Sequence, residues 1–472
     1  MKREAPPVVP EQEMEAQRLA MREVAGLVDG PKTYHIVTYG CQMNAHDSET
    51  LSGMLTDMGM AAAPSREEAD LIVFNTCCIR DNAERKALGN MTWLKQLKKK
   101  RPDLVLCVCG CMMQQQKMAQ IILRQYPFFD VAFGTHNLHR FPSLLLRALE
   151  TRRQVIEVKD ETGSIAEGMP IRRESPHKAY VTIMYGCDNF CSYCIVPYVR
   201  GRERSRDPDA IVREAEALLQ DGVSEIMLLG QNVNSYGNDL SGDASFPRLL
   251  RRLDALGVPR IRFMTSHPKD LSDALIETMA GSRRIAGHLH LPVQAGSDAT
   301  LRAMNRGYTR GEYLSRVRAL KSAMPDIALT TDLIVGFPGE TEDDFLQTLS
   351  LVQEVRYDSA YTFIFSPREG TRAARLSDPV DPGVAADRIA RLIAAQEKIT
   401  AEVYVGLVGT RQTVLVEESA RRSAHQVAGK CGRNITVNFA GEKDLIGRFV
   451  DVVITGAGHN TLKAQKEEPK WP

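Results

Sequence analysis

The chain has 472 residues, a formal net charge of +1 at pH 7 and 25% charged side chains. This length predicts two to four domains with buried cores, and the near-neutral charge excludes a globally basic surface, so any contact with nucleic acid must come from local patches. No apolar run approaches the length of a membrane span, and no secretory signal pattern is present. We expect a cytoplasmic monomer whose cysteines are reduced rather than paired in disulfides.

The N-terminal residues 1–32 are predicted to form an extension. A proline-rich start is followed by a stretch from Glu11 to Arg22 whose apolar residues recur too sparsely for a strong helix face. We expect this extension to be mobile or loosely docked. Residues 33–150 are predicted to form the first domain, and residues 151–178, which are polar and contain several glycines and prolines, the linker to the next.

Three cysteines of the first domain each follow an apolar, β-branched run, and they are about 35 residues apart: Cys41, Cys77 and Cys111. Such runs, separated by helix-like segments, predict parallel strands of βαβ units in an open α/β domain. The thiols would then meet at the carboxyl edge of one sheet, where open α/β folds bind their ligands. Three thiolates are one too few for a closed zinc site, so this set predicts an iron–sulfur cluster with an open position.

Three cysteines near these ligands carry weaker signals. Cys107 and Cys109 lie inside the third strand run, where they would share a face with Cys111 and pack in the core. Cys78 directly follows Cys77, and neighbouring residues near a strand end point opposite ways. We therefore expect Cys77, and not Cys78, to be the ligand.

The densest cysteine motif follows the strand-like run 179–185. Cys187, Cys191 and Cys194 form a CxxxCxxC motif, and Tyr193 stands before the last cysteine. Cysteines are often buried simply as small hydrophobes, but three at this spacing in a glycine-led loop favour a metal cluster. No His or fourth Cys nearby completes a zinc site. The motif resembles that of the radical S-adenosylmethionine (radical SAM) superfamily, which implies a 4Fe–4S cluster whose free iron binds SAM.

The central region 179–405 alternates strand-like runs with helical patterns, which predicts an incomplete (β/α)6 barrel, also the usual radical SAM architecture. The predicted strands are Tyr180–Tyr185, Glu225–Leu229, Ile261–Thr265, His288–Leu291, Ala328–Val335 and Tyr361–Phe365. Polar, glycine-rich ends follow them; these are either plain turns or the ends from which barrel active sites are built. The resemblance implies that several contact SAM, and the predicted contacts are Tyr193, Gln231, Asn232, Ser266, Gln294 and Asp332.

Residues 406–470 contain short alternating runs with polar turns, which predict a small all-β barrel or sandwich. After a radical SAM barrel, this module resembles the TRAM domain, an OB-like RNA-binding fold. Its cations are either ordinary solvated surface or phosphate contacts, which carry affinity more than sequence information. The predicted RNA-binding residues are Lys430, Arg433, Lys443 and Arg448.

Several phrases in a fixed order carry a family resemblance. Residues 39–49 read Tyr-Gly-Cys-Gln-Met-Asn-Ala-His-Asp-Ser-Glu, residues 75–80 read Asn-Thr-Cys-Cys-Ile-Arg, and residues 194–206 read Cys-Ile-Val-Pro-Tyr-Val-Arg-Gly-Arg-Glu-Arg-Ser-Arg. From about Tyr34 to about Leu462 the chain resembles the methylthiotransferases of the radical SAM superfamily. The Gly-Cys-Gln-Met-Asn phrase is similar to the branch that acts on prenylated adenosine in tRNA. The sister branches show Gly-Cys-Lys-Val-Asn or Gly-Cys-Pro-Lys-Asn instead.

The resemblance implies that a methylthio group replaces the hydrogen on carbon 2 of an N6-prenylated adenosine beside the anticodon. That aromatic hydrogen is not acidic, so no side-chain base removes it at a useful rate, whereas a carbon-centred radical does. We therefore expect two 4Fe–4S clusters, one at each cysteine set, with SAM as cofactor. The unpaired anticodon loop of tRNA exposes the base, and an electron donor such as a flavodoxin or ferredoxin is required.

Two alternatives share these signals. A methylthiotransferase of the same family that acts on threonylcarbamoyl-adenosine or on a ribosomal-protein aspartate would have the same six ligands. A non-enzymatic iron–sulfur RNA-binding sensor belongs to another class of protein. Such a sensor would need no polar strand ends around a SAM-sized cavity, and it would release no 5′-deoxyadenosine from SAM.

Overall fold

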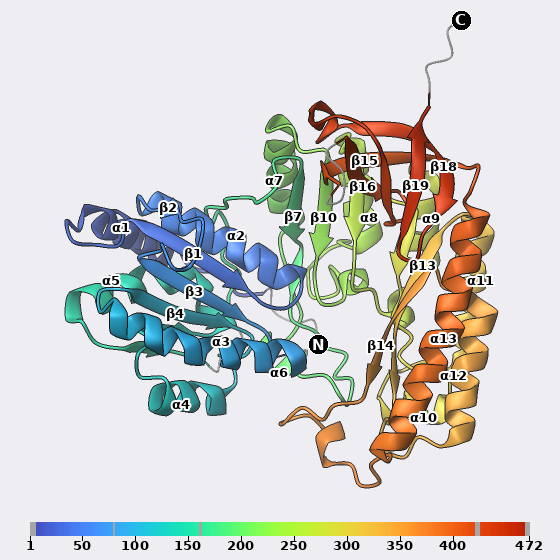
Figure 1. Cartoon of the computed structure of the whole chain (residues 1–472), viewed down its shortest axis with the longest axis horizontal. Helices are drawn as coiled ribbons and strands as arrows, with labels where there is room; N and C mark the ends of the chain where they lie inside the picture. Colours follow the sequence, from blue (N-terminus) through green and yellow to red (C-terminus); the bar gives the residue numbers. More distant parts are fainter. Residues whose placement is uncertain (1–5, 79–80, 160–162, 421–424, 468–472) are drawn as a thin grey trace, which may run out of the picture.

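The structure, a computed structural model, describes residues 6–78, 81–159, 163–420 and 425–467. Figure 1 shows a layered α/β domain at the start of the chain, a half-open ring of parallel strands with helices outside it, and a small β-barrel at the end. Within the described ranges, no helix is both long and apolar enough to cross a membrane. The domain boundaries predicted from the sequence stay predictions.

The N-terminal domain is built on a parallel sheet with the strand order β2-β1-β3-β4-β5-β6. Its strands are β1 (Thr33–Thr38), β2 (Ala61–Ala62), β3 (Leu71–Thr76), β4 (Val105–Gly110), β5 (Val131–Phe133) and β6 (Val155–Glu157). β1, β3 and β4 are the runs predicted before the three dispersed cysteines. β6 lies inside the predicted linker, since a three-residue strand is too short to stand out from its polar neighbours. The open parallel α/β architecture is confirmed.

Helices cover both faces of this sheet, as a parallel sheet requires. On one face α1, α2 and α5 pack against the strands, and on the other α3 and α4 do. Their bounds are α1 (Glu11–Gly26), α2 (Gln42–Asp57), α3 (Asp81–Lys100), α4 (Gln116–Gln125) and α5 (Phe141–Thr151), with the 3-10 helix η1 (Thr135–Arg140) before α5.

Helix α1 corrects the expectation of a mobile or loosely docked extension. Met14, Met21 and Val24 of this helix are buried, and the helix packs against α5. The backbone N–H of Ser143 in α5 donates to Oε1 of Gln17 at 3.2 Å. The apolar face is narrow, and contacts with a second helix, which a periodicity within one segment cannot reveal, hold it in place.

The central domain forms the predicted incomplete barrel from two three-stranded parallel sheets, β7-β10-β11 and β12-β13-β14. The strands are β7 (Lys178–Thr182), β10 (Glu225–Leu229), β11 (Arg260–Phe263), β12 (His288–His290), β13 (Ala328–Val335) and β14 (Ser359–Ile364). A bridge between Ile261 and Ile285 joins the two sheets. All six predicted strands are present within a few residues of their predicted bounds, so the barrel prediction is confirmed.

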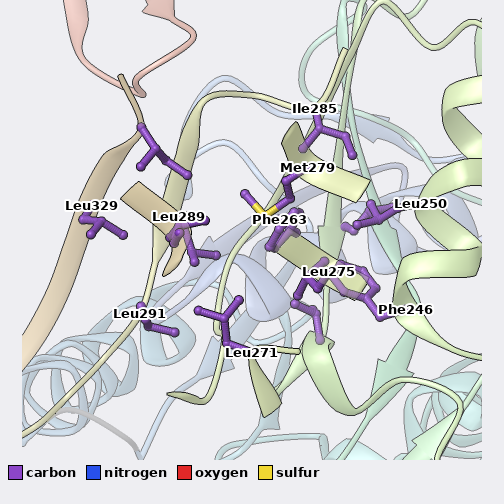
Figure 2. Packing of buried hydrophobic residues seen from close by; sticks show 14 of the residues in the cluster. Phe246, Leu250, Phe263, Leu271, Leu275, Met279, Ile285, Leu289, Leu291 and Leu329 are labelled. Carbon is purple, nitrogen blue, oxygen red and sulfur yellow. The ribbon is translucent and has the colours of Figure 1, made fainter. Parts of the chain in front are cut away.

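Amphipathic helices close the outer side of the barrel (Figure 1). They are α7 (Pro208–Gln220), α8 (Phe246–Ala255), α9 (Asp273–Gly281), α10 (Asp298–Ala303), α11 (Arg310–Ala323), α12 (Glu342–Val355) and α13 (Pro382–Gly406). Figure 2 shows the side chains between α8, α9 and the strands, where the rings of Phe246 and Phe263 meet edge to face at 4.9 Å. The short elements β8 (Met184–Tyr185), α6 (Val196–Val199) and β9 (Arg204–Ser205) flank the CxxxCxxC loop.

The C-terminal module is a closed barrel in the order β15-β16-β17-β19-β18, as the small all-β prediction requires. Its strands are β15 (Arg411–Ser419), β16 (Gln426–Cys431), β17 (Thr436–Ala440), β18 (Phe449–Ala457) and β19 (Thr461–Lys466). Arg260 and Arg262 of β11 donate to the carbonyl oxygens of Lys430 and Cys431 at 3.0 and 2.6 Å. The buried carboxylate of Glu225 pairs with both arginines. The module is therefore fixed to the central barrel by a buried charge network.

Candidate functional site

The CxxxCxxC loop is fixed by backbone contacts with the barrel. Gly186 starts the loop with a φ of +70°, and a Cβ there would stand 2.0 Å from the carbonyl oxygen of Arg202, so only glycine fits. Within the loop, the N–H of Ser192 donates to the carbonyl of Met304 at 2.9 Å, and the carbonyl of Ser192 accepts from Ala373 at 2.7 Å. The course of the loop is thereby set by the fold.

Arg306 organises the thiols of this loop. Its buried guanidinium donates through Nη1 to Sγ of Cys191 at 3.2 Å and through Nη2 to the carbonyl of Pro292 at 2.7 Å. Burial raises the pKa of Cys187 and of Cys194 to about 12. A buried thiol with a raised pKa keeps its proton until a metal ion displaces it, and a fixed cation nearby favours the thiolate.

The second set of cysteines gathers around Asn44 at the carboxyl edge of the sheet. The Sγ atoms of Cys41 and Cys111 lie 3.8 and 3.9 Å from Oδ1 of Asn44. At Gly40, whose φ is +115°, an added Cβ would stand 2.8 Å from Sγ of Cys77. The structure therefore brings the three predicted ligands to one edge of the sheet, as the strand pattern indicated. Their role as ligands stays a prediction.

Arg200 links the segment that follows the CxxxCxxC loop to the second cysteine set. It lies six residues after Cys194 in the chain, and its Nε donates to Sγ of Cys111 in the other domain at 3.2 Å. Its Nη2 donates to Oδ1 of Asn44 at 3.0 Å and to Oδ2 of Asp47 at 2.8 Å. Burial raises the pKa of Cys111 to about 12, and the Arg200 guanidinium opposes that rise. One side chain thus reaches from the segment after the first cysteine loop to the second set.

Cys107 and Cys109 pack in the hydrophobic core on the α1, α2 and α5 side of the sheet, as predicted. The expectation that they share a face with Cys111 is wrong, because Cys111 packs on the α3 and α4 side. Gly110 causes the change: its φ of +96° interrupts the strand alternation just before Cys111.

Cys77 and Cys78 are equally buried, each with 1% of its surface exposed, so burial does not separate them. Cys78 packs in the apolar cluster under α3 and α4 together with Cys111, and burial raises the pKa of both thiols, so neither property sets Cys78 apart from a ligand. Cys77 faces the Gly40 turn that leads to Cys41. This position favours Cys77 as the ligand, which remains a prediction.

The donor chemistry of both sets fits an iron–sulfur cluster. Within the described ranges, no three His, Cys, Asp or Glu side chains converge closely enough to hold a single metal ion. The thiols of each set still raise one another's pKa, which places them near each other. The ligands of a cluster bind separate irons, and three thiols of this kind are the protein donors that such a cluster uses.

Two predicted SAM contacts at the carboxyl ends of β10 and β11 differ in what their side chains can still bind. Oγ of Ser266 is buried and has no hydrogen-bond partner among the described residues. Asn232 is engaged within the protein, since its Oδ1 accepts from the N–H of His267 at 3.0 Å and its Nδ2 donates to Asp270 at 2.7 Å. Asn232 thus shapes the loop, while Ser266 has an unused hydroxyl.

The other predicted SAM contacts lie at the same rim. Gln294 has a φ of +77°, and its N–H donates to the carbonyl of Asp332 at 3.0 Å, which joins the segment after β12 to the middle of β13. The hydroxyl of Tyr193 lies 3.5 Å from Nη1 of Arg306. The side chains of Gln231 and Asp332 are half-buried. These contacts stay predictions.

Four polar residues of the site were missed. Nε2 of His267 and both side-chain atoms of Asn234 are buried without a partner in the part of the chain that the structure describes. Both lie in the polar segments that follow predicted barrel strands, so their position after a strand could have identified them as site residues. Arg200 and Arg306 offered none, because the thiols they contact are 89 and 115 residues away in the chain.

The four cations predicted to bind RNA divide into two kinds. Arg433 pairs with Asp358 of the central barrel at 2.5 Å, and only 15% of its side chain is exposed. Lys430 is half-buried on the same side of the module, whereas Lys443 and Arg448 are exposed. The first two contribute to docking of the module, which the sequence could not show because it does not tell which face is covered.

Comparisons with known families agree with this division of the chain. Residues 181–352 match the radical SAM superfamily, residues 33–134 match an uncharacterized protein family termed UPF0004, and residues 406–466 match the TRAM domain. The structure of the radical SAM methyltransferase TsrM from Kitasatospora setae, with cobalamin and a [4Fe-4S] cluster bound, aligns with a TM-score of 0.51 at 14% identity, covering 72% of this chain and 76% of that one. The fold and the cysteine loop thus define a radical SAM enzyme.

Curated relatives show to which family of radical SAM enzymes the chain belongs. The chain is 53% identical over 424 residues to the tRNA-2-methylthio-N(6)-dimethylallyladenosine synthase of Alkaliphilus oremlandii (strain OhILAs), covering 90% of each chain. It is 48% identical over 462 residues to the protein of that name from Thermoanaerobacter sp. (strain X514), covering 98% of each. The chain belongs to the family of the tRNA-2-methylthio-N(6)-dimethylallyladenosine synthases, and the resemblance inferred from the sequence is confirmed.

Proposed function

We propose that this enzyme adds a methylthio group to carbon 2 of an N6-prenylated adenosine beside the anticodon of tRNA. The observation that carries the proposal is the 3.2 Å contact between Nε of Arg200 and Sγ of Cys111, because it links the segment that follows the CxxxCxxC loop to the second set of cysteines in the other domain. Relatives that cover nearly the whole chain have names that describe this product.

Two 4Fe–4S clusters would be held by the chain, one by Cys187, Cys191 and Cys194 and the other by Cys41, Cys77 and Cys111. With SAM bound, the first supplies a radical able to take a hydrogen atom from carbon, and the second supplies a place for sulfur. The superfamily supports an iron–sulfur cluster and SAM, while the count of two rests on the cysteine sets.

The residues of the chain bind and position these groups. Arg306 holds the Cys191 thiol and the Pro292 carbonyl in one arrangement. The unpartnered Oγ of Ser266 and Nε2 of His267 at the barrel rim are suited to hydrogen bonds with SAM or substrate. Arg200 keeps the Cys111 edge of the first domain against the segment that follows the CxxxCxxC loop.

The partner is proposed to be the anticodon stem-loop of tRNA. Its unpaired bases can be turned into a pocket without opening a helix. The exposed side chains of Lys443 and Arg448 on the C-terminal module would contact its phosphates. A cytoplasmic location, a monomeric state and a flavodoxin or ferredoxin as electron donor belong to the same proposal.

Matched anticodon stem-loops test the substrate. Loops bearing prenyladenosine, threonylcarbamoyl-adenosine or unmodified adenosine are incubated with reconstituted enzyme, SAM and reductant, and methylthio nucleosides are measured by mass spectrometry. The prenyl loop should react far ahead of the others, since an apolar pocket gains roughly 0.8 kcal/mol per buried CH2 and rejects an unpaired carboxylate. Faster reaction of the threonylcarbamoyl loop would overturn the substrate assignment. Absence of 5′-deoxyadenosine in all three would overturn the radical chemistry.

A further inference from the structure

A cavity of about 450 Å³ lies between the N-terminal domain and the barrel, separate from the barrel rim where the SAM contacts are predicted. We call it the seam cavity. Its walls are α2, η1, the connector residues 164–171 and the barrel elements β8, β9 and α7. Four arginines line it, and one of them is Arg200, whose Nε also touches Cys111. The cavity therefore adjoins the second cysteine set.

The ion pairs of the seam cavity are unevenly distributed. Arg200 is paired with Asp47 at 2.8 Å. Arg206 is paired with two carboxylates, Glu167 and Glu214, at 2.5 and 2.8 Å. These three residues are the carboxylates of the lining, so its third buried arginine has no carboxylate of its own, while the fourth arginine, Arg213, is exposed.

Arg204 is the buried arginine of the lining that has no carboxylate partner within ion-pair distance among the described residues, and only 5% of its surface is exposed. Its Nη2 donates to the carbonyl of Arg200 at 2.9 Å, while its Nε has no hydrogen-bond partner in the described part of the chain. Burying an unpaired cation costs free energy unless a counter-ion joins it. Consistent with this, burial lowers the pKa of Arg204 to about 10.

Among the neighbours of Arg204, the charge of Arg200 adds to the positive potential, while Tyr185 and Asp239 oppose it. Burial, followed by the charges of Arg204 and Arg200, lowers the pKa of His136 to about 4. The ring of Tyr185 lies under the Arg204 guanidinium, 5.7 Å from its centre. At Gly163 an added Cβ would stand 2.8 Å from Nη1 of Arg204, so the connector closes tightly over the cation. The connector therefore covers Arg204 on this side.

We propose that the seam cavity binds a small anion, of the size of hydrosulfide or phosphate, through the buried guanidinium of Arg204. A hydrosulfide ion is the anion that the reaction calls for, because neither SAM nor adenosine supplies sulfur in a form that leaves both carbon skeletons intact. This assignment of the ion rests on the proposed function; the anion site itself does not. The seam cavity would then hold the sulfur donor one side chain, Arg200, away from Cys111.

Anion binding is measured on the full-length, cluster-loaded protein without tRNA. Sodium hydrosulfide, sodium phosphate and sodium chloride are compared at equal ionic strength under anaerobic conditions, by calorimetry and by the shift in thermal unfolding temperature. The variant is Arg204→Met, which removes the charge and keeps the length of the side chain. Arg251→Met, at an exposed position of α8, is the matched control. If Arg204→Met does not fold, Ala166→Phe fills the cavity from its connector wall.

Hydrosulfide and phosphate should each bind and raise the unfolding temperature. The Arg204→Met variant should weaken binding by about tenfold or more, the effect of losing a hydrogen bond from a charged group, and Arg251→Met should not change it. Phosphate binding without hydrosulfide binding would support the anion site and overturn the sulfur assignment. Binding of neither ion, or equal binding to Arg204→Met, would overturn the site. If the stem-loop experiment fails while both ions bind through Arg204, the anion site stands and only the proposed function falls.

Discussion

Nε of Arg200 donates a hydrogen bond to Sγ of Cys111 at 3.2 Å. The two residues belong to different domains, and the same guanidinium is paired with Asp47 at 2.8 Å. Arg200 is 4% exposed and Asp47 9%, so this is a buried ion pair with a thiol attached. A pair of this kind fixes the relative position of the domains, since no water can replace either partner without moving the backbone.

Replacement of Arg200 by Met should destabilise the protein. It should also lower methylthiolation of tRNA more strongly than reductive cleavage of SAM. The buried carboxylate of Asp47 would lose its partner, which costs about 3–5 kcal/mol of the free energy of unfolding. Reductive cleavage of SAM should persist, because the CxxxCxxC loop keeps its own contacts to Arg306. Methylthiolation of tRNA should fall strongly. Urea unfolding and the two product assays measure these effects.

A double-mutant cycle distinguishes two effects of Arg200→Met: the loss of the ion pair with Asp47, and the cost of leaving the Asp47 carboxylate buried without a partner. In Arg200→Met with Asp47→Asn, the carboxylate that would be left unpaired is absent, so part of the stability should return. Methylthiolation should not return, because the link to Cys111 is still missing. Recovery of activity together with stability would show that Arg200 acts on the fold alone.

The two proposed clusters should be separable by mutation. Anaerobically reconstituted protein should hold about eight irons, as expected for two four-iron clusters. Cys191→Ala should lose SAM cleavage and keep about half of the iron. Cys77→Ala should keep SAM cleavage and lose sulfur insertion. Iron analysis and electron paramagnetic resonance of the reduced proteins check both outcomes.

Cys78→Ala is the matched control for Cys77→Ala, because the two thiols are adjacent and equally buried. It should retain the iron of the N-terminal set and lose only a little stability by removal of a small buried side chain. If Cys78→Ala removes that iron while Cys77→Ala leaves it, the ligand assignment is reversed.

The exposed cations of the C-terminal module should contribute to tRNA affinity without affecting chemistry. Each of Lys443→Ala and Arg448→Ala should weaken binding and reduce the slope of log affinity against log salt by about one, as for a lost phosphate contact. Filter binding of tRNA at several salt concentrations measures this slope. SAM cleavage in the absence of tRNA should be unchanged.

Arg433→Ala provides the contrast. Its guanidinium pairs with Asp358 across the boundary of the module, so its loss should lower the unfolding temperature and leave the salt slope near that of the unaltered protein. A drop in the slope as large as that of Lys443→Ala would restore Arg433 to the RNA surface. Point variants are preferable to truncation here, because removing the module would leave the buried Arg260 and Arg262 without their carbonyl partners.

Much of the fold followed from local patterns. The strands Glu225–Leu229 and Ala328–Val335 have the predicted bounds, since each contains a run of apolar residues and is followed by a glycine-led polar end. The helix Glu11–Gly26 was underestimated, because its stability comes from α5, more than a hundred residues later. The short strand Val155–Glu157 was not predicted, for the same reason: its pairing with β5, and not a pattern in its own residues, makes it a strand.

The candidate site was predictable where its residues stand in one short motif and unpredictable where they meet across the fold. The first cysteine set could be predicted because its three thiols lie within eight residues of the sequence. The face of Cys111 was misjudged because the left-handed backbone of Gly110 cannot be read from an apolar run. Arg200 and Arg306, which touch thiols of distant segments, became visible only once the domains were placed together.

Two histidines at the seam between the domains, the half-buried His136 and the buried His139, predict how stability depends on pH. Burial is the main cause that lowers the pKa of His136 and of His139 from 6.5 to about 4. In the unfolded chain each imidazole takes up a proton as the pH falls below 6.5, whereas in the folded protein it stays neutral until about pH 4. The unfolded state therefore binds more protons in this window, and stability is lost as the pH falls through it.

Each histidine can contribute up to about 1.4 kcal/mol per pH unit to that loss. The measurement is the free energy of unfolding in urea at several pH values across the window. His139→Leu removes one proton-binding group while filling a similar volume, so its pH dependence should be shallower than that of the unaltered protein. Carboxylates titrate in part of the same pH range, so the test compares the pH dependence of the variant with that of the unaltered protein. Parallel curves for His139→Leu and the unaltered protein would show that His139 gains its proton equally in the folded and unfolded states.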